Sequence, residues 1–259
     1  KQQGAVSMKK RFAAFVSTVL AAVLCACSAA PKDVLPNKAA QPTEAPTQQA
    51  QTTQAAPTEQ PTPEPDPVQQ LLEEMTLEQK VGQLFLVRPD SLDLSQTQDQ
   101  INDAKADGVT ELTDAMRQTL AEYPVGGVVI FGKNLESPQQ ITQFLDDLQQ
   151  ASDTPLFAAI DEEGGLVARL ANNAAFDLPQ YESAAAVGTS GNPEDARAMG
   201  RTIGGYLKEY GFNLDFAPVA DVNTNPDNPV IGTRAFSSEP QTAADLVGGA
   251  CAALADAGR

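Results

Sequence analysis

Four apolar runs, separated by segments with helical periodicity, constrain the fold of this chain more than any other feature. The runs occupy residues 84–87, 126–131, 155–160 and 212–219. Each run has the length of a strand, and the first three are apolar throughout. Strands that are apolar on both faces and alternate with helices indicate a parallel sheet with helices packed against both sides.

Capping residues and apolar spacing mark the helices between these runs. Ser137 precedes residues 138–148, in which apolar side chains recur at helical spacing, and it predicts the start of a helix there. Thr76 and Gln79 have the spacing of a capping box. Further helices are expected at Val68–Met75, Glu194–Tyr210 and Pro240–Ala257, and the polar segment 91–123 is expected to be mostly helical.

This alternation fits either a doubly wound sheet or a closed barrel. No glycine-rich phosphate loop follows the first apolar run, which argues against a dinucleotide-binding fold. We therefore predict an α/β fold, the N-terminal part of a (β/α)8 TIM-type barrel. Residues 68–259 are expected to hold about four of the eight strand–helix units, because a complete barrel usually needs roughly 250 residues.

The first 67 residues differ in composition and are predicted to lie outside the barrel. Basic Met8–Arg11 and the apolar run after it are typical of a secretory signal peptide, and Cys27 lies where a bacterial lipobox places its acylated cysteine. We expect a lipoprotein signal peptide with upstream residues at 1–27 and a disordered Pro/Gln/Thr/Ala-rich linker at 28–67. A lipid on Cys27 would anchor the protein at the extracytoplasmic face of the cell membrane. An ordinary signal peptide is the alternative.

The charge and the missing residue types narrow the chemistry. A net charge of −17 repels phosphate backbones, so we expect no nucleic-acid partner. The absence of histidine excludes a Ser–His or Cys–His couple and a histidine-ligated zinc within these 259 residues, and nothing indicates a metal or organic cofactor. Three cysteines make no disulfide framework, and Cys251 is expected to be a small buried residue of the last helix.

Candidate binding residues follow the third apolar run, at the strand end where barrel active sites lie. Asp161 comes directly after this run, Gly164 and Gly165 allow a tight turn, and Arg169 can reach back toward the carboxylate. A carboxylate and a guanidinium together suit the neighbouring hydroxyls of a sugar. A salt bridge that only closes the turn is an equally open alternative.

Polar residues around the fourth run are further candidates. Asp215 lies inside the predicted strand and is expected to be a buried, hydrogen-bonded structural acid, whereas Asp221 lies near the strand end and could serve either role. Arg234 lies on a long loop, and an exposed ion pair with Asp221 or Asp227 is the alternative to ligand binding. Residues 221–232 are not an EF-hand loop, because they lack its required glycine and final glutamate.

Four segments taken together resemble glycoside hydrolase family 3, in its β-N-acetylhexosaminidase branch. They are Met75–Phe85, the Asp-x-Glu-Gly-Gly-x-x-x-Arg pattern of Asp161–Arg169, then Asn213–Asn223 and Asn228–Phe236. The resemblance covers essentially all of residues 68–259. It implies a retaining exo-glycosidase that removes terminal non-reducing β-linked N-acetylglucosamine from cell-wall muropeptides or chito-oligosaccharides.

The resemblance also implies roles for individual residues. By matching positions, Asp161, Arg169 and Arg234 would bind the hydroxyls of the sugar. The acid/base histidine and the nucleophilic aspartate of the family would follow Arg259, so no catalytic residue is assigned within this chain and the chain alone is expected to be inactive. A family 3 β-glucosidase and a non-catalytic sugar-binding lipoprotein are the alternatives.

Overall fold

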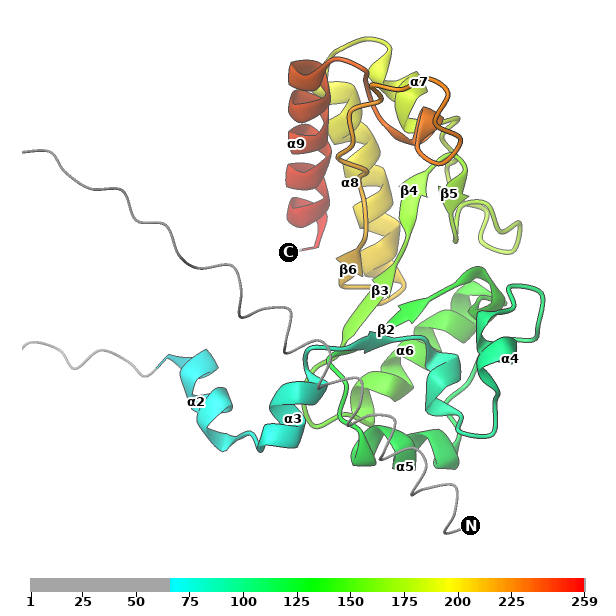
Figure 1. Ribbon diagram of the computed structural model, residues 1–259, viewed down its shortest axis with the longest axis vertical. Helices are drawn as coiled ribbons and strands as arrows, with labels where there is room; N and C mark the ends of the chain where they lie inside the picture. Colours follow the sequence, from blue (N-terminus) through cyan, green and yellow to red (C-terminus); the bar gives the residue numbers. More distant parts are fainter. Residues whose placement is uncertain (1–65, 259) are drawn as a thin grey trace, which may run out of the picture. The chain divides into compact units, whose positions relative to one another are not determined.

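This computed structural model describes residues 66–258. The main sheet within this range has four parallel strands (Figure 1). Its strands are β1 (Leu86–Val87), β2 (Gly127–Ile130), β3 (Phe157–Ile160) and β6 (Leu214–Asp215), and they lie side by side in chain order. Chain order within a parallel sheet is the arrangement of a barrel, whereas a doubly wound sheet reverses direction at a switch point. The predicted α/β fold of barrel type is therefore confirmed.

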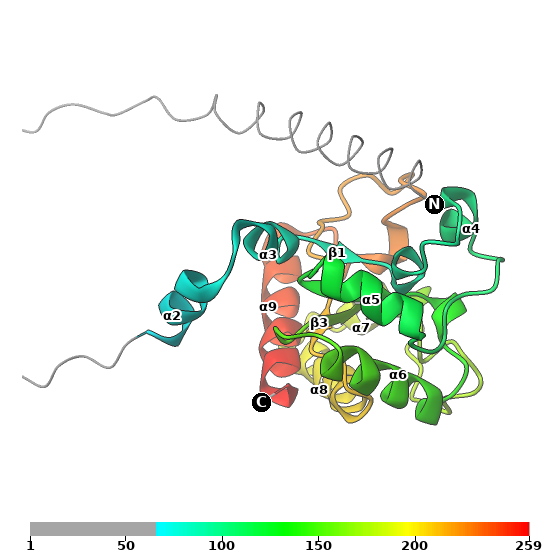
Figure 2. The ribbon, with the colours of Figure 1, turned by 90° about the horizontal axis from the view of Figure 1, so that it is seen from below.

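Helices connect the strands and cover them. α6 (Pro138–Gln150) connects β2 with β3, and α8 (Pro193–Glu209) precedes β6. α9 (Pro240–Ala257) packs along α8, as Figures 1 and 2 show. The two helices approach closely because Gly200 has no side chain, and a Cβ there would lie 2.6 Å from the carbonyl oxygen of Ala250. The shorter helices are α2 (Pro67–Glu74), α3 (Leu77–Gly82), α4 (Gln98–Asn102), α5 (Asp114–Glu122) and α7 (Ala184–Gly188), with 3-10 turns η1 (Pro89–Leu92), η2 (Gly132–Asn134) and η3 (Gly232–Arg234).

The helix caps predicted from the sequence are present. Thr76 Oγ1 accepts from the Gln79 amide at 3.2 Å and Gln79 Oε1 accepts from the Thr76 amide at 2.8 Å, which completes a capping box at the start of α3. Ser137 Oγ accepts from the Gln140 amide at the start of α6. The predicted apolar stripe of α6 is buried, and it consists of Ile141, Phe144, Leu145 and Leu148.

The hydrophobic core gathers side chains from the sheet and from the helices beside it. Ile130 of β2 and Ile160 of β3 have no exposed surface. They pack in one cluster with Met116 of α5, Ile203 of α8 and Leu246 of α9. Burying each such side chain stabilises the fold by about 1.5–3 kcal/mol. The core therefore holds the strand ends, where the candidate residues lie, in fixed relative positions.

Two predictions for the first part of the barrel are wrong. Only Leu86–Val87 of the first apolar run pairs with β2, and Leu84 is 79% exposed. The segment 91–123 is not mostly helical, because residues that favour turns separate α4 from α5. The helix predicted at Val68–Met75 is confirmed as α2, which has no buried residue.

Two predictions for the later part are also wrong. The fourth strand, predicted over residues 212–219, is only two residues long, because its partner β3 ends at Ile160. The last backbone hydrogen bond between them runs from the Phe216 amide to the Ile160 carbonyl. Cys251 is exposed rather than buried. It lies off the stripe of α9 that contains Ala250 and Ala253, and this stripe is the one that faces α8.

Several predictions concern residues that the structure does not describe. The predicted signal peptide, the lipid on Cys27 and nearly all of the predicted linker lie outside residues 66–258, and α2 already begins at Pro67. Among the helices of residues 66–258, none combines the length and the apolar character that a membrane crossing requires.

Candidate functional site

Directly after β3 the chain folds into an antiparallel hairpin of β4 (Glu162–Gly164) and β5 (Val167–Ala168). Gly164 and Gly165 form its turn with φ angles of 81° and 67°, which residues with a side chain rarely adopt. Space also requires glycine, since a Cβ on Gly165 would lie 2.8 Å from the carbonyl oxygen of Glu182. The sequence predicts the tight turn but not the pairing of the strands on either side of it.

The hairpin brings Arg169 back to Asp161, as predicted. Nη2 of Arg169 donates to Oδ2 of Asp161 at 3.0 Å, and the two side chains remain 33% and 26% exposed. Nε of Arg169 is buried and has no hydrogen-bond partner among the described residues. This pair offers an acceptor and a donor to adjacent hydroxyls of a sugar. The same contact also agrees with the alternative prediction, a salt bridge that only closes the turn.

Arg234 reaches the same hairpin from η3. Its Nε and Nη2 atoms donate to the two carboxylate oxygens of Glu163 at 2.7 and 2.6 Å, and this ion pair raises the pKa of Arg234. The alternative prediction, an ion pair of Arg234 with Asp221 or Asp227, is therefore wrong. Both of these aspartates are exposed, and a bidentate bond to a buried carboxylate is stronger than a contact in solvent.

One short stretch of chain therefore organises both arginines. Asp161 and Glu163 lie on either side of Glu162 in the chain, and each of them binds an arginine, whereas Glu162 binds two backbone amides and Tyr206. The structure brings Asp161 and Arg169 into contact and joins Arg234 to them through Glu163. Glu163 is absent from the residues predicted from the sequence, although its spacing from Asp161 is a signal that points to it.

Glu162 is fully buried and holds the hairpin from inside. Its oxygens accept from the amides of Leu170 and Ala171 and from the Tyr206 hydroxyl of α8, each at 2.9 Å. Burial and the neighbouring Glu162 carboxylate raise the pKa of Tyr206, which therefore remains a hydroxyl donor. These bonds fix the segment that carries Arg169 relative to α8.

Asp215 lies at the carboxyl end of β6, beside the hairpin. Its Oδ1 accepts from the Glu162 amide at 3.0 Å, whereas Oδ2 is buried without a partner among the described residues. Burial raises the pKa of Asp215 to about 7; the bond from the Glu162 amide opposes this rise, and the charges of Glu162, Asp161 and Glu163 add to it. The predicted hydrogen bond is confirmed for Oδ1, whereas the residue as a whole is partly buried and not fully buried.

The ends of β1 and β2 complete this edge of the sheet. The guanidinium of Arg88 lies 4.4 Å from the centroid of the Phe131 ring, and that of Arg169 lies 5.6 Å from it. Lys133 and Asp90 form an ion pair at 3.1 Å, with side chains only 6% and 0% exposed. This buried pair ties the loop after β2 to η1.

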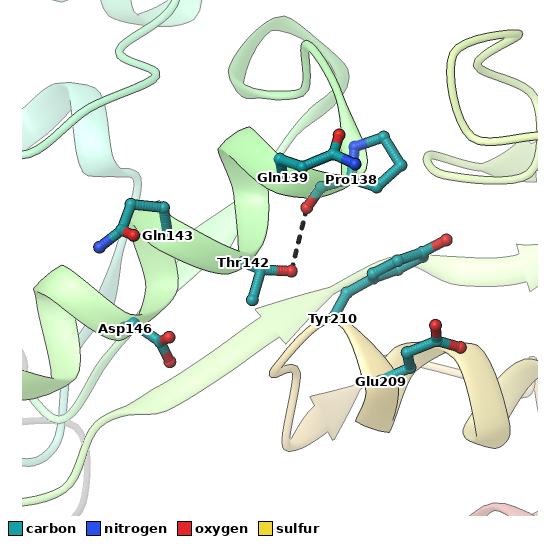
Figure 3. Close-up of a pocket in the computed structure, with 7 residues that line it drawn as sticks. All are labelled: Pro138, Gln139, Thr142, Gln143, Asp146, Glu209 and Tyr210. Atoms are coloured by element: carbon teal, nitrogen blue, oxygen red, sulfur yellow. Dashed lines mark hydrogen bonds between the residues drawn. The ribbon is translucent and has the colours of Figure 1, made fainter.

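A hollow elsewhere on the surface does not contain the predicted residues. Figure 3 shows it between α6 and the end of α8, with Thr142 and Tyr210 among its lining residues. Asp161, Arg169 and Arg234 do not line it. Within residues 66–258, no three His, Cys, Asp or Glu side chains gather as a metal site would require.

The fold and the motifs at its strand ends define a known family. The family description "Glycosyl hydrolase family 3 N terminal domain" matches residues 76–258. The chain belongs to glycosyl hydrolase family 3, and the resemblance predicted from four sequence segments is confirmed.

Individual relatives point to one branch of this family. The chain is 36% identical over 143 residues to the beta-hexosaminidase A of Pseudoalteromonas piscicida (53% of this chain, 24% of that protein). It is 33% identical over 153 residues to a beta-hexosaminidase of Thiobacillus denitrificans (58% and 42%). A solved family 3 beta-N-acetylglucosaminidase from Paenibacillus sp. str. FPU-7 superposes with a TM-score of 0.59 at 34% identity (71% and 31%). The matched region thus spans less than half the length of each of these proteins.

Proposed function

We propose that this chain forms the sugar-binding part of a retaining exo-β-N-acetylhexosaminidase. The observation that carries the proposal is the pairing of Asp161 with Arg169 and of Glu163 with Arg234 at the carboxyl end of β3, where barrel enzymes bind their substrates. Relatives named beta-hexosaminidase and beta-N-acetylglucosaminidase support the choice of sugar. The proposed substrates are cell-wall muropeptides or chito-oligosaccharides that end in a non-reducing β-linked N-acetylglucosamine.

The two ion pairs serve the sugar in different ways. Asp161 and Arg169 are partly exposed, so Asp161 accepts from one hydroxyl while Arg169 donates to its neighbour. Both oxygens of the buried Glu163 are occupied by Arg234, so Glu163 orients this guanidinium toward the ligand instead of binding the ligand itself. Because the groups are paired before a ligand arrives, little side-chain entropy is lost on binding.

Cleavage of the glycoside requires two further groups. A retaining enzyme needs a nucleophile and a proton donor on either side of the scissile bond, about 5–5.5 Å apart in the usual version with two carboxylates. In this proposal an aspartate nucleophile and an acid/base histidine come from residues beyond Arg259, in keeping with the greater length of the relatives. The 259 residues contain no histidine. By itself this chain is therefore proposed to bind the sugar without hydrolysing the bond.

The proposed location is the extracytoplasmic face of the cell membrane, where a lipid on Cys27 would hold the protein near cell-wall glycans. Mass spectrometry of the mature protein tests this directly. A lipid adduct on Cys27, lost in Cys27→Ala, is the expected result. A mature protein that begins elsewhere and carries no lipid would contradict the anchor without affecting the sugar site.

Titration of the chain with N-acetylglucosamine and with glucose, followed by two-dimensional NMR, tests the binding proposal. We expect N-acetylglucosamine to bind to the chain. The substitution Asp161→Asn should lower its affinity by about tenfold or more, since a hydrogen bond to a charged group contributes about 1.5–3 kcal/mol. Asp147→Asn is the matched control, because Asp147 is also paired with an arginine and is 30% exposed. Binding of neither sugar would refute the proposal.

Assays with p-nitrophenyl glycosides distinguish the alternatives. We expect the full-length gene product to release p-nitrophenol from the N-acetyl-β-glucosaminide and this chain alone to release none. Preference of the full-length product for the β-glucoside would identify a family 3 β-glucosidase. Binding without any release by the full-length product would identify a non-catalytic sugar-binding lipoprotein.

A further inference from the structure

Asp215 occupies a position that the sugar-binding proposal does not explain. It lies opposite Ile160 in the register of β3 and β6, at the last residue of both strands. The Phe216 amide donates to the Ile160 carbonyl at 2.9 Å, and beyond it the Glu162 amide donates to Oδ1 of Asp215 at 3.0 Å. The side chain of Asp215 therefore continues the pairing of the two strands past the point where their backbones part.

We propose that Asp215 is a positioning residue of this site, which holds the Glu162 peptide and thereby sets the directions of the Asp161 and Glu163 carboxylates. The inference rests on the proposed function, since its consequence is the geometry offered to a sugar. The Glu162 amide is part of the peptide that joins Asp161 to Glu162, so a rotation of this peptide changes the backbone of Asp161 directly and reaches Glu163 through Glu162. Those neighbours in turn hold the two arginines of the site.

The contacts of Glu162 show why its amide needs a partner of this kind. The Glu162 side chain is anchored by the Leu170 and Ala171 amides and by the Tyr206 hydroxyl. Its amide, at a residue with no exposed surface, is bound by Asp215. A buried amide without a partner is unfavourable, so loss of this carboxyl group drives the peptide to turn toward another acceptor. The Glu162 residue is therefore held from both sides.

The charges that face Asp215 make this role depend on protonation. The charges of Glu162, Asp161 and Glu163, in the hairpin and at the end of β3, act on Asp215, and Asp215 also interacts electrostatically with Tyr206 of α8. Burial and these charges raise the pKa of Asp215 to about 7. The neutral acid accepts from the amide without repelling its neighbours, whereas the ionised form adds a negative charge beside three others. We expect the hairpin to be held best below this pKa.

The side-chain Nε–H resonances of Arg169 and Arg234, followed by NMR on the full chain, report the hairpin geometry without any sugar. In the wild type they should titrate with a midpoint near the Asp215 pKa of about 7. Asp215→Asn keeps the acceptor and cannot ionise, so this titration should be absent. Asp227→Asn, at an exposed aspartate, is the control and should titrate as the wild type does.

A second variant removes the acceptor. Asp215→Leu keeps the branching at Cγ but is larger and has no acceptor, and it should displace both arginine resonances at every pH. The proposal is overturned if Asp215→Asn titrates like the wild type, or if a folded Asp215→Leu leaves both resonances in place. Where Asp215→Leu does not fold, the comparison of the wild type with Asp215→Asn decides.

A sugar titration separates this inference from the proposed function. The affinity of the wild type for N-acetylglucosamine should fall by about tenfold between about pH 6 and about pH 8, a change that corresponds to about one hydrogen bond. The affinity of Asp215→Asn should not change over the same range. A wild type that binds no sugar at any pH refutes the proposed function, while the arginine resonances still decide the role of Asp215. Resonances that titrate with no change in affinity would overturn the link between hairpin geometry and binding.

Discussion

The stability of the fold should depend on pH through Asp215, and Asp215→Asn should remove that dependence. The pKa of the Asp215 carboxyl rises from 3.8 to about 7 on folding. Between these values the folded state binds more protons than the unfolded state, so the contribution of Asp215 is complete below about pH 4 and is lost as the pH rises through about 7. Roughly three pKa units, at about 1.4 kcal/mol each, give a loss of about 4 kcal/mol in the free energy of unfolding.

Urea unfolding of the full chain at a series of pH values, followed by circular dichroism, measures this loss. The difference between the wild type and Asp215→Asn isolates Asp215, because every other titrating group is common to both proteins. This difference should change by about 4 kcal/mol between about pH 4 and about pH 8, in favour of Asp215→Asn at the higher pH. A change below about 1 kcal/mol would refute the reasoning, since an exposed or well-partnered Oδ2 would carry no such penalty.

Three further predictions concern the scaffold of the site. Lys133→Met should lower the free energy of unfolding in urea by about 3–5 kcal/mol, because it leaves the Asp90 carboxylate buried without its cation, and adding Asp90→Asn should recover part of the loss. Gly165→Ala should lower the melting temperature more than Gly191→Ala: both have positive φ, but only the Cβ at Gly165 would meet other atoms within 4 Å, and equal losses would contradict this steric argument. Thr76→Ala should cost about 1 kcal/mol in urea unfolding by removing the cap of α3, and no loss would show that this cap does not stabilise the fold.

Features that depend on residues close together in the chain could be predicted from the sequence. The capping box at Thr76 and the bounds of α9 agree with the structure, because a cap and a helical stripe involve residues within a few positions of one another. The approach of Arg169 to Asp161 belongs to the same group. The two residues are eight positions apart, and the glycines between them predict the turn that joins them.

Exposure could not be predicted in the same way. Cys251 and Leu84 are apolar residues in apolar surroundings, yet both are exposed, because burial depends on which face of an element a distant part of the chain covers. The pairing of β4 with β5 could not be predicted from the local sequence pattern either. Its strands are three and two residues long, too short to show an alternating pattern.

By itself the sequence determined the order of the four strands of the main sheet, the helices α6, α8 and α9, the family, and the strand ends at which polar residues gather, because these follow from periodicity, caps and motif spacing along the chain. Only the tertiary structure decided that Arg234 pairs with Glu163, 71 residues away, and that Asp215 binds the Glu162 amide. In a chain with 34 acidic residues, local pattern cannot rank the possible partners of one arginine. The choice depends on distance in space and on burial, which the packed fold alone sets.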